Sequence, residues 1–159
     1  MARLETRSAE ETAAAGAALA GRLQRGDIVL VAGELGSGKT TFVRGACRAL
    51  GVVEPVTSPT FTIGQLYRAA EGARAGPGDL RLEIAHLDLY RLATLAGEDP
   101  ALLDDYLTPE RVAFVEWPAL AEAELEGPAP ALRAVARVRI EHAARENHRV
   151  IEVTDSSPS

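Results

Sequence analysis

The sequence predicts an α/β protein built around a central, largely parallel β-sheet, and three observations carry this prediction. The 159 residues match the length of one ordinary domain, and 47% hydrophobic content is enough to form a core. The apolar run at 28–32 is continuous rather than alternating, which is typical of a strand covered on both faces. A glycine-rich segment and then helix-compatible residues follow that run directly. We therefore expect a single domain over residues 1–159, with a core at about 8–153 and a flexible C-terminal end.

Two helices are expected in the first third of the chain. The first is an alanine-rich helix over about 8–24. It begins with a capping box, in which the Ser8 hydroxyl accepts a hydrogen bond from a free backbone N–H and Glu11 reaches back to the cap. The second helix is expected over 39–50, and Gly51 is a natural C-terminal stop.

The remainder of the chain reads as strands joined by loops. Pro55 and Pro59 exclude a helix from the segment around them, which is therefore predicted to be extended. Two partly alternating segments, 61–67 and 82–88, are expected to pair as an antiparallel hairpin. Further strands are predicted at 112–115, 134–140 and 150–153. The expected architecture is a largely parallel sheet with an antiparallel hairpin and helices on both faces.

Composition and charge exclude several classes of protein. A net charge of −6 and a pI of about 5.1 lack the basic footprint of a free-standing nucleic-acid-binding protein. No apolar stretch approaches the roughly 18 residues of a membrane helix, and acids occupy the N-terminus where a signal peptide would be apolar. The single cysteine, Cys47, forms neither an intramolecular disulfide nor a cysteine zinc site. We therefore expect a cytoplasmic protein.

The glycine-rich segment matches the phosphate-binding loop pattern and lies between a predicted strand and a predicted helix. Gly33, Gly36 and Gly38 allow successive backbone N–H groups to point at phosphate oxygens, and the helix N-terminus adds partial positive charge. Lys39, the sole lysine of the chain, would place its charge on the β and γ phosphates, and the Thr40 hydroxyl would bind Mg²⁺. A compact ammonium suits this position better than a forked guanidinium. The segment predicts a P-loop NTPase fold.

A magnesium nucleotide site also needs a carboxylate at the end of a neighbouring strand, and the sequence offers Asp88 and Glu116. Glu116 follows four apolar residues, so apolarity favours it, whereas His86 interrupts the run before Asp88. Either acid alone is typical of an exposed strand end. The phosphate-binding loop upstream favours a functional role for at least one of them.

Four short motifs follow one another along the chain. They are Gly-Glu-Leu-Gly-Ser-Gly-Lys-Thr-Thr-Phe at 33–42, Thr-Ser-Pro-Thr-Phe at 57–61, His-Leu-Asp-Leu-Tyr-Arg at 86–91 and Glu-Trp-Pro at 116–118. In this order and spacing the chain resembles the bacterial TsaE (YjeE) family over about 8–153. The resemblance implies an ATPase required for threonylcarbamoyladenosine modification of tRNA beside the anticodon. It further implies ATP and Mg²⁺ as cofactors, homologues of TsaD and TsaB as protein partners, hydrolysis that is weak alone and stimulated by those partners, and tRNA reached only through the complex.

The resemblance also implies roles for individual residues. Thr40, Asp88 and Glu116 would surround Mg²⁺, while Lys39 would act on the phosphates as a catalytic residue. Glu116 would orient the attacking water, or would interact with Mg²⁺ indirectly, through a group that itself binds the metal. The nucleotide would contact Gly33, Glu34, Leu35, Gly36, Ser37, Gly38, Lys39, Thr40, Thr41 and Trp117, the last of which reads equally well as a core aromatic residue. A switch-like segment sensing the γ phosphate would comprise Thr57, Ser58 and Thr60.

Other functions of a phosphate-binding loop can be weighed against the sequence. A Ras-like GTPase reads guanine through an Asn-Lys-x-Asp motif, which the absence of a second lysine excludes. A small-molecule kinase remains an alternative, because Arg68, Arg74 and Arg81 would suit a lid over a phosphoryl acceptor, although they also suit a solvated loop. A nucleotide-dependent binding module is a third reading. Acids dominate 83–127 and arginines dominate 131–150. Each charge is typical of a solvated surface, and a further hypothesis is that the two segments face different partners.

Overall fold

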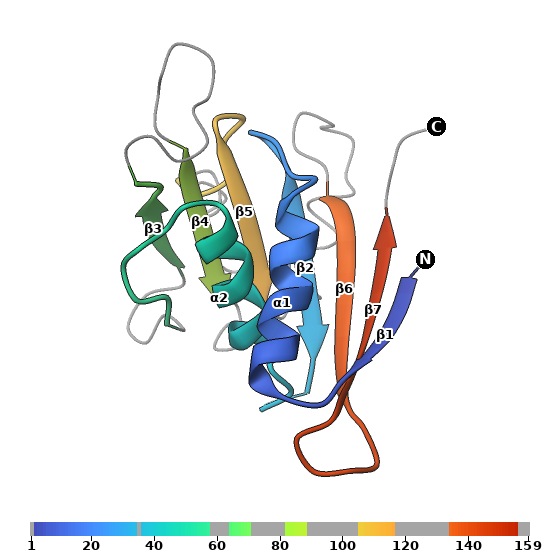
Figure 1. Ribbon diagram of the computed structural model, residues 1–159. Helices are drawn as coiled ribbons and strands as arrows, with labels where there is room; N and C mark the ends of the chain where they lie inside the picture. The colour runs from blue at the N-terminus through green and yellow to red at the C-terminus, as the bar shows by residue number, and fades with distance from the viewer. Residues whose placement is uncertain are drawn as a thin grey trace.

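The computed structural model describes residues 2–34, 36–57, 64–70, 82–88, 105–116 and 134–155. These residues form one mixed sheet with the strand order β1-β7-β6-β2-β5-β4-β3. Its four central strands, β6, β2, β5 and β4, are parallel, and antiparallel strands flank them on both sides (Figure 1). The strands are β1 (Ala2–Thr6), β2 (Ile28–Gly33), β3 (Gly64–Arg68), β4 (Glu83–Asp88), β5 (Arg111–Glu116), β6 (Ala134–His142) and β7 (Arg149–Asp155), and the helices are α1 (Ala9–Ala20) and α2 (Lys39–Ala49).

The predicted α/β class and the predicted antiparallel hairpin are confirmed, since β3 pairs antiparallel with β4 and places Tyr67 opposite Ile84. Strands β6 and β7 also pair antiparallel with each other, a pairing that the sequence did not predict. The capping box is confirmed at its first bond, since the Ser8 hydroxyl accepts from the Glu11 N–H at 3.2 Å. The first helix ends at Ala20, earlier than the predicted boundary near residue 24.

Strand β1 was not expected from the sequence. It adds to the edge of the sheet by pairing antiparallel with β7, with Leu4 opposite Ile151. Of its five residues only Thr6 is buried, so no apolar pattern marks the segment as a strand. Backbone pairing with β7, rather than burial of side chains, holds this strand in the sheet. This strand leads directly into α1.

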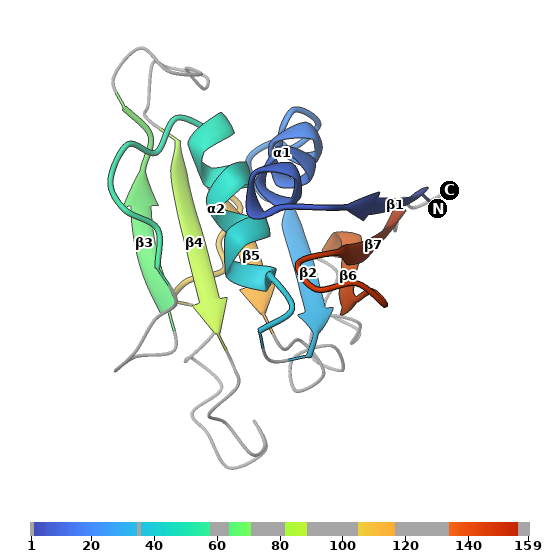
Figure 2. The same cartoon turned by 60° about the horizontal axis from the view of Figure 1, so that its bottom comes forward.

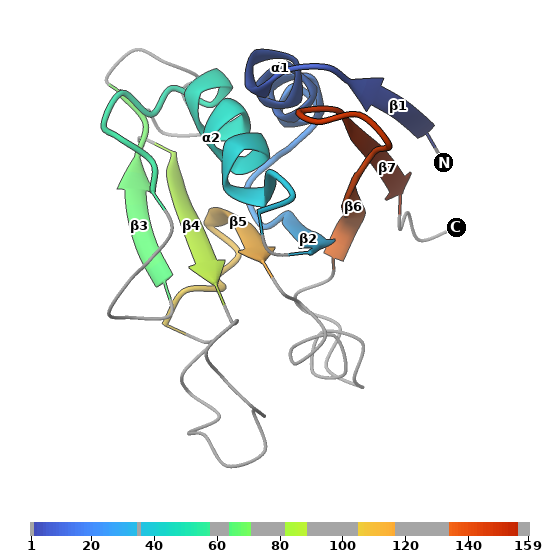
Figure 3. The same cartoon turned by 90° about the horizontal axis from the view of Figure 1, so that it is seen from below.

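Both described helices lie on the same face of the sheet (Figure 3). The larger apolar cluster lies between them and the sheet and includes Val29, Phe42 and Phe114. A smaller cluster on the opposite face includes Leu30 and Val115. The sequence also predicts helices on the other face of the sheet. That part of the prediction lies outside the described residues. Within those ranges, no helix is long and apolar enough to cross a membrane.

Helices α1 and α2 pack with their backbones in close contact. A Cβ atom on Gly16 would lie 2.0 Å from the Phe42 carbonyl oxygen, and one on Gly45 would lie 1.9 Å from the Ala13 carbonyl oxygen. Gly16 of α1 and Gly45 of α2 permit this approach, because neither has a side chain. Both helices run back along the sheet against the direction of its parallel strands (Figure 1), and α2 begins near the end of β2 (Figure 2).

Candidate phosphate-binding and magnesium site

The phosphate-binding loop joins the end of β2 to the start of α2, as the sequence predicts. Gly38 caps α2 with a φ of 106°, a conformation that L side chains rarely adopt. Gly33 lies against β6, since a Cβ atom there would be 2.3 Å from the Ile140 carbonyl oxygen. The first glycine therefore serves a close backbone approach and the last one a left-handed turn into the helix.

Lys39 extends back across the start of the loop. Its ammonium donates hydrogen bonds to the carbonyl oxygens of Gly33 at 3.0 Å and Glu34 at 2.8 Å. The side chain is buried, and this burial lowers the pKa of Lys39, while the charges of Glu116 and Asp88 act to raise it. The single lysine thus lies between the loop and both predicted carboxylates.

Glu116 reaches the helix N-terminus from the end of β5. The Thr40 hydroxyl donates to its two carboxylate oxygens at 3.2 and 3.3 Å. A second partner is His86 of β4, whose Nε2 shares a hydrogen bond with Glu116 Oε2. Glu116 is 2% exposed and His86 is fully buried. The predicted carboxylate and the predicted Mg²⁺ hydroxyl are therefore in contact inside the protein.

Asp88 lies beside Glu116, because the two residues are register partners on the parallel strands β4 and β5. Asp88 is half-buried. Together with the Thr40 hydroxyl they form the kind of oxygen donor set that Mg²⁺ takes when phosphate groups and waters complete its coordination. In the described part of the chain, no group of three or more His, Cys, Asp or Glu side chains could hold a metal ion unaided. The residues therefore fit a nucleotide-bound Mg²⁺ rather than an all-protein metal cage.

The remaining predicted site residues lie around this centre or outside the described ranges. Thr57 is exposed, and the Tyr67 hydroxyl lies 3.4 Å from both its backbone nitrogen and its carbonyl oxygen. Of the arginines considered for a kinase lid, Arg68 is exposed and lies 3.9 Å from Glu83. The predicted residues outside the described ranges are Leu35, Ser58, Arg74, Arg81, Thr60 and Trp117.

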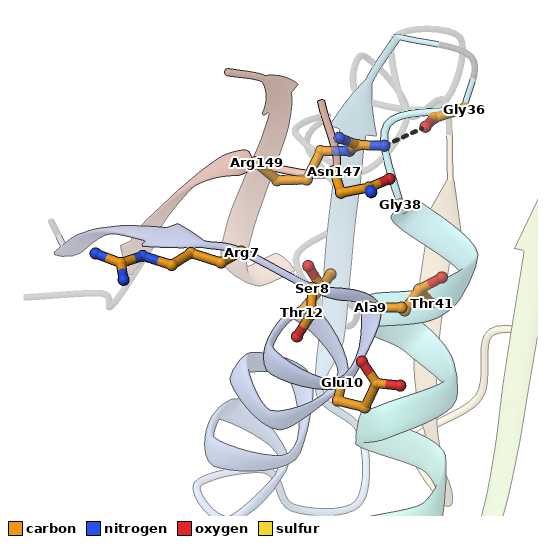
Figure 4. A pocket seen from close by; sticks show the side chains of 10 residues that line it. All are labelled: Arg7, Ser8, Ala9, Glu10, Thr12, Gly36, Gly38, Thr41, Asn147 and Arg149. Atoms are coloured by element: carbon orange, nitrogen blue, oxygen red, sulfur yellow. Dashed lines mark hydrogen bonds between the residues drawn. The ribbon is translucent and has the colours of Figure 1, made fainter. Parts of the chain in front are cut away.

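A cavity of about 390 Å³ lies beside the loop on the side away from the carboxylates. It is formed by the start of α1, the loop and the turn between β6 and β7, which contribute Thr12, Thr41, Asn147 and Arg149 among others (Figure 4). The Arg149 guanidinium hydrogen-bonds the loop itself. The cavity thus extends from the loop to the turn between β6 and β7.

Sequence reasoning missed two residues of this site. His86 belongs to the motif at 86–91, but in the sequence it was interpreted only as an interruption of an apolar strand. The signal for its role was its two-residue spacing from Asp88, because residues two apart lie on the same face of a strand. Arg149 reads as one cation among many arginines. Only the turn between β6 and β7 brings it to the loop.

Comparisons with known proteins find similar chains. A family model described as "Threonylcarbamoyl adenosine biosynthesis protein TsaE" matches residues 6–151. The tRNA threonylcarbamoyladenosine biosynthesis protein TsaE of Treponema pallidum is 34% identical over 123 residues, spanning 77% of this chain and 83% of that protein. The protein of the same name in Bacillus subtilis is 38% identical over 116 residues, spanning 73% of this chain and 66% of that protein. The crystal structure of YdiB from Bacillus subtilis matches with a TM-score of 0.69 and 30% identity, covering 98% of this chain and 86% of that one.

Proposed function

Since this chain belongs to the TsaE family of tRNA threonylcarbamoyladenosine biosynthesis proteins and has its P-loop NTPase fold, we propose that it is the family's Mg²⁺-dependent ATPase subunit. It would act in the cytoplasm with TsaD and TsaB homologues and reach tRNA only through their complex. ATP cleavage would reset that complex rather than activate the threonylcarbamoyl group. The observation that carries the proposal is the contact between Thr40 and the buried carboxylate of Glu116 at the end of the phosphate-binding loop.

The residues divide the chemistry between them. Lys39 would offset the negative charge of the β and γ phosphates. Mg²⁺, when bound, supplies further charge neutralisation on the phosphate oxygens, and Thr40 and Asp88 would hold it. Glu116 would accept a hydrogen bond from the attacking water and direct its oxygen at the γ phosphorus. The new oxygen–phosphorus bond forms as the bond to the bridging oxygen breaks, which yields ADP and phosphate.

Further residues, most of them outside the described ranges, complete the proposal. Trp117 follows Glu116 directly and would lie beside the nucleotide. Thr57, Ser58 and Thr60 would sense the γ phosphate as a switch-like segment. Adenine would be preferred to guanine, because no second lysine is present to build the guanine-reading motif.

The decisive experiment is hydrolysis of ATP and of GTP by the full chain, measured with and without the TsaB and TsaD proteins of the same organism. We expect slow ATP hydrolysis by the chain alone, a steep rise when both partners are added, and little GTP hydrolysis. An ATPase rate that the partners leave unchanged would contradict the proposed role.

Lys39→Ala provides the matching test of the loop. Removing the only ammonium at the phosphates should weaken ATP binding about a hundredfold or more, measured by isothermal titration calorimetry. Arg48→Ala is a suitable control, because Arg48 is exposed in the last turn of the same helix. Unchanged affinity in the Lys39 variant would overturn the assignment of the loop.

A further inference from the structure

Arg149 is the first residue of β7, and its side chain lies against the phosphate-binding loop rather than in solvent (Figure 4). Its Nε–H donates to the Ser37 carbonyl oxygen at 2.8 Å, and Nη2 donates to the Gly36 carbonyl oxygen at 3.4 Å. Nη1 donates to the carbonyl oxygen of its neighbour, His148, at 2.9 Å. Among the described residues, the guanidinium thus spreads its hydrogen bonds over three backbone carbonyls, two of which belong to the loop.

These bonds fix the direction of peptide planes. In a planar trans peptide the C=O and the following N–H point in opposite directions. A donor on the Ser37 carbonyl oxygen therefore turns the Gly38 N–H to the other side of the chain. The preceding plane contributes less to a ligand, because the Ser37 N–H already donates to the Glu34 carbonyl oxygen at 3.0 Å.

The plane between Ser37 and Gly38 also needs an external brace. Gly38 has no side chain to restrict its backbone, and its φ of 106° lies in a region that only glycine enters freely. Without a partner on the Ser37 carbonyl, that peptide would rotate and aim its oxygen, rather than its N–H, at an anion. An arginine from a distant strand can hold it because the planar fork offers several donors in fixed directions.

We propose that Arg149 is a positioning residue of the phosphate-binding loop, which holds the Ser37–Gly38 peptide with its N–H directed at the bound phosphate groups. This role rests on the proposed function, since it presumes that the loop binds nucleotide phosphates. It makes the hairpin of β6 and β7 part of the phosphate site. The ligand class on which Arg149 acts is the polyphosphate chain, not the nucleoside.

The test uses two substitutions of the same residue and one control. Arg149→Gln removes the charge and the fork, whereas Arg149→Lys keeps the charge but cannot bridge the loop carbonyls. Arg139→Gln is the control, because Arg139 is exposed on β6 and pairs with Glu141 at 3.0 Å. Each full-length variant is titrated with ATP and, separately, with inorganic triphosphate, and binding is measured by calorimetry.

We expect both Arg149 variants to bind ATP and triphosphate about ten- to a hundredfold more weakly, as for the loss of a charge-assisted hydrogen bond. The control should bind both within about twofold of the unmodified chain. In ¹⁵N NMR spectra without nucleotide, the Gly38 amide signal should shift in both Arg149 variants and stay in place in the control. This readout reports the peptide plane directly and does not depend on catalysis.

Three outcomes would overturn the role. If the Arg149→Lys variant keeps the wild-type affinity and the Arg149→Gln variant loses it, the charge of the side chain acts and its fork does not. Weakened ATP binding with unchanged triphosphate binding would place Arg149 on the nucleoside, in the adjoining cavity. Unchanged affinity for both probes would remove the role while leaving the proposed function intact. A wild-type chain that binds neither probe would instead overturn the proposed function, and this role with it.

Discussion

The phosphate-binding loop lies between two flanks that differ in charge and in the pairing of their two strands, which is parallel on one flank and antiparallel on the other. On one flank, β5 and β4 run parallel to β2 and end at the loop with Glu116 and Asp88. On the other flank, β6 and β7 form an antiparallel hairpin whose turn brings Arg149 to the loop. The carboxylate flank contacts Thr40 at the start of α2, and the arginine flank contacts the carbonyl of Ser37 in the loop before the helix.

In the proposed function the two flanks have separate tasks. The carboxylate flank would offer oxygen donors to a cation, and the arginine flank would orient backbone donors toward an anion. Lys39 lies between them, bonded to the loop carbonyls and influenced by both carboxylates. Each flank can therefore be disturbed separately, and the two disturbances should have different signatures.

The largest effect on folding stability is expected where the arginine flank touches the loop backbone, at Gly33. In Gly33→Ala the new Cβ would lie 2.3 Å from the Ile140 carbonyl oxygen, so β6 and the loop must separate. The variant combines two costs, the overpacking against β6 and a φ that alanine rarely adopts. We therefore expect the free energy of unfolding, measured by denaturant titration, to fall by about 2–5 kcal/mol. Gly36→Ala is the matched control: its φ is also positive, at 75°, but nothing lies within 4 Å of the new atom. Equal losses in both variants would mean that φ alone matters and that β6 does not support the loop.

Glu116→Ala should disable the carboxylate flank while leaving nucleotide binding largely intact. The substitution removes the partner of Thr40 and of His86 and the group proposed to orient water. Partner-stimulated ATP turnover should fall by about 10²–10⁴-fold, the usual contribution of a positioned general base. Glu141→Ala, an exposed acid on β6, serves as the control for loss of a carboxylate. Full turnover in the Glu116 variant would refute its role.

The contrast between the flanks also explains what could be predicted from the sequence. Lys39, Thr40 and the two carboxylates were predictable because a loop motif fixes local geometry and the carboxyl ends of parallel strands meet at one edge of a sheet. Apolarity favoured Glu116 over Asp88, and the structure makes the two residues register partners at the ends of β5 and β4.

The arginine flank was not predictable in the same way. Arg149 stands at the start of an antiparallel strand, and its position depends on the length of the turn before it, in which Asn147 adopts a φ of 65°. Strand β1 escaped prediction because its ladder with β7, rather than apolar side chains, holds it in the sheet. Contacts between backbone groups that are far apart in the sequence produce no periodic pattern of apolar and polar residues, so the sequence does not reveal them.

The smallest predicted effect concerns His86, and it tests whether the carboxylate flank depends on a buried donor. His86→Gln can place an amide N–H near the position of Nε2 and still bond Glu116, whereas His86→Leu cannot. Turnover should fall about tenfold in the leucine variant and remain within about threefold of wild type in the glutamine variant, as measured in the stimulated ATPase assay.

Folding stability provides the control for this pair of His86 variants. Nδ1 of His86 is buried without a partner among the described residues, so leucine removes one unsatisfied polar atom while it takes a donor from Glu116. These changes oppose each other, and the free energy of unfolding should stay within about 1 kcal/mol of wild type. Equal turnover in the two variants would assign His86 to packing alone. A rate lost in the leucine variant without a matching loss of stability would instead show that Glu116 must be oriented as well as present.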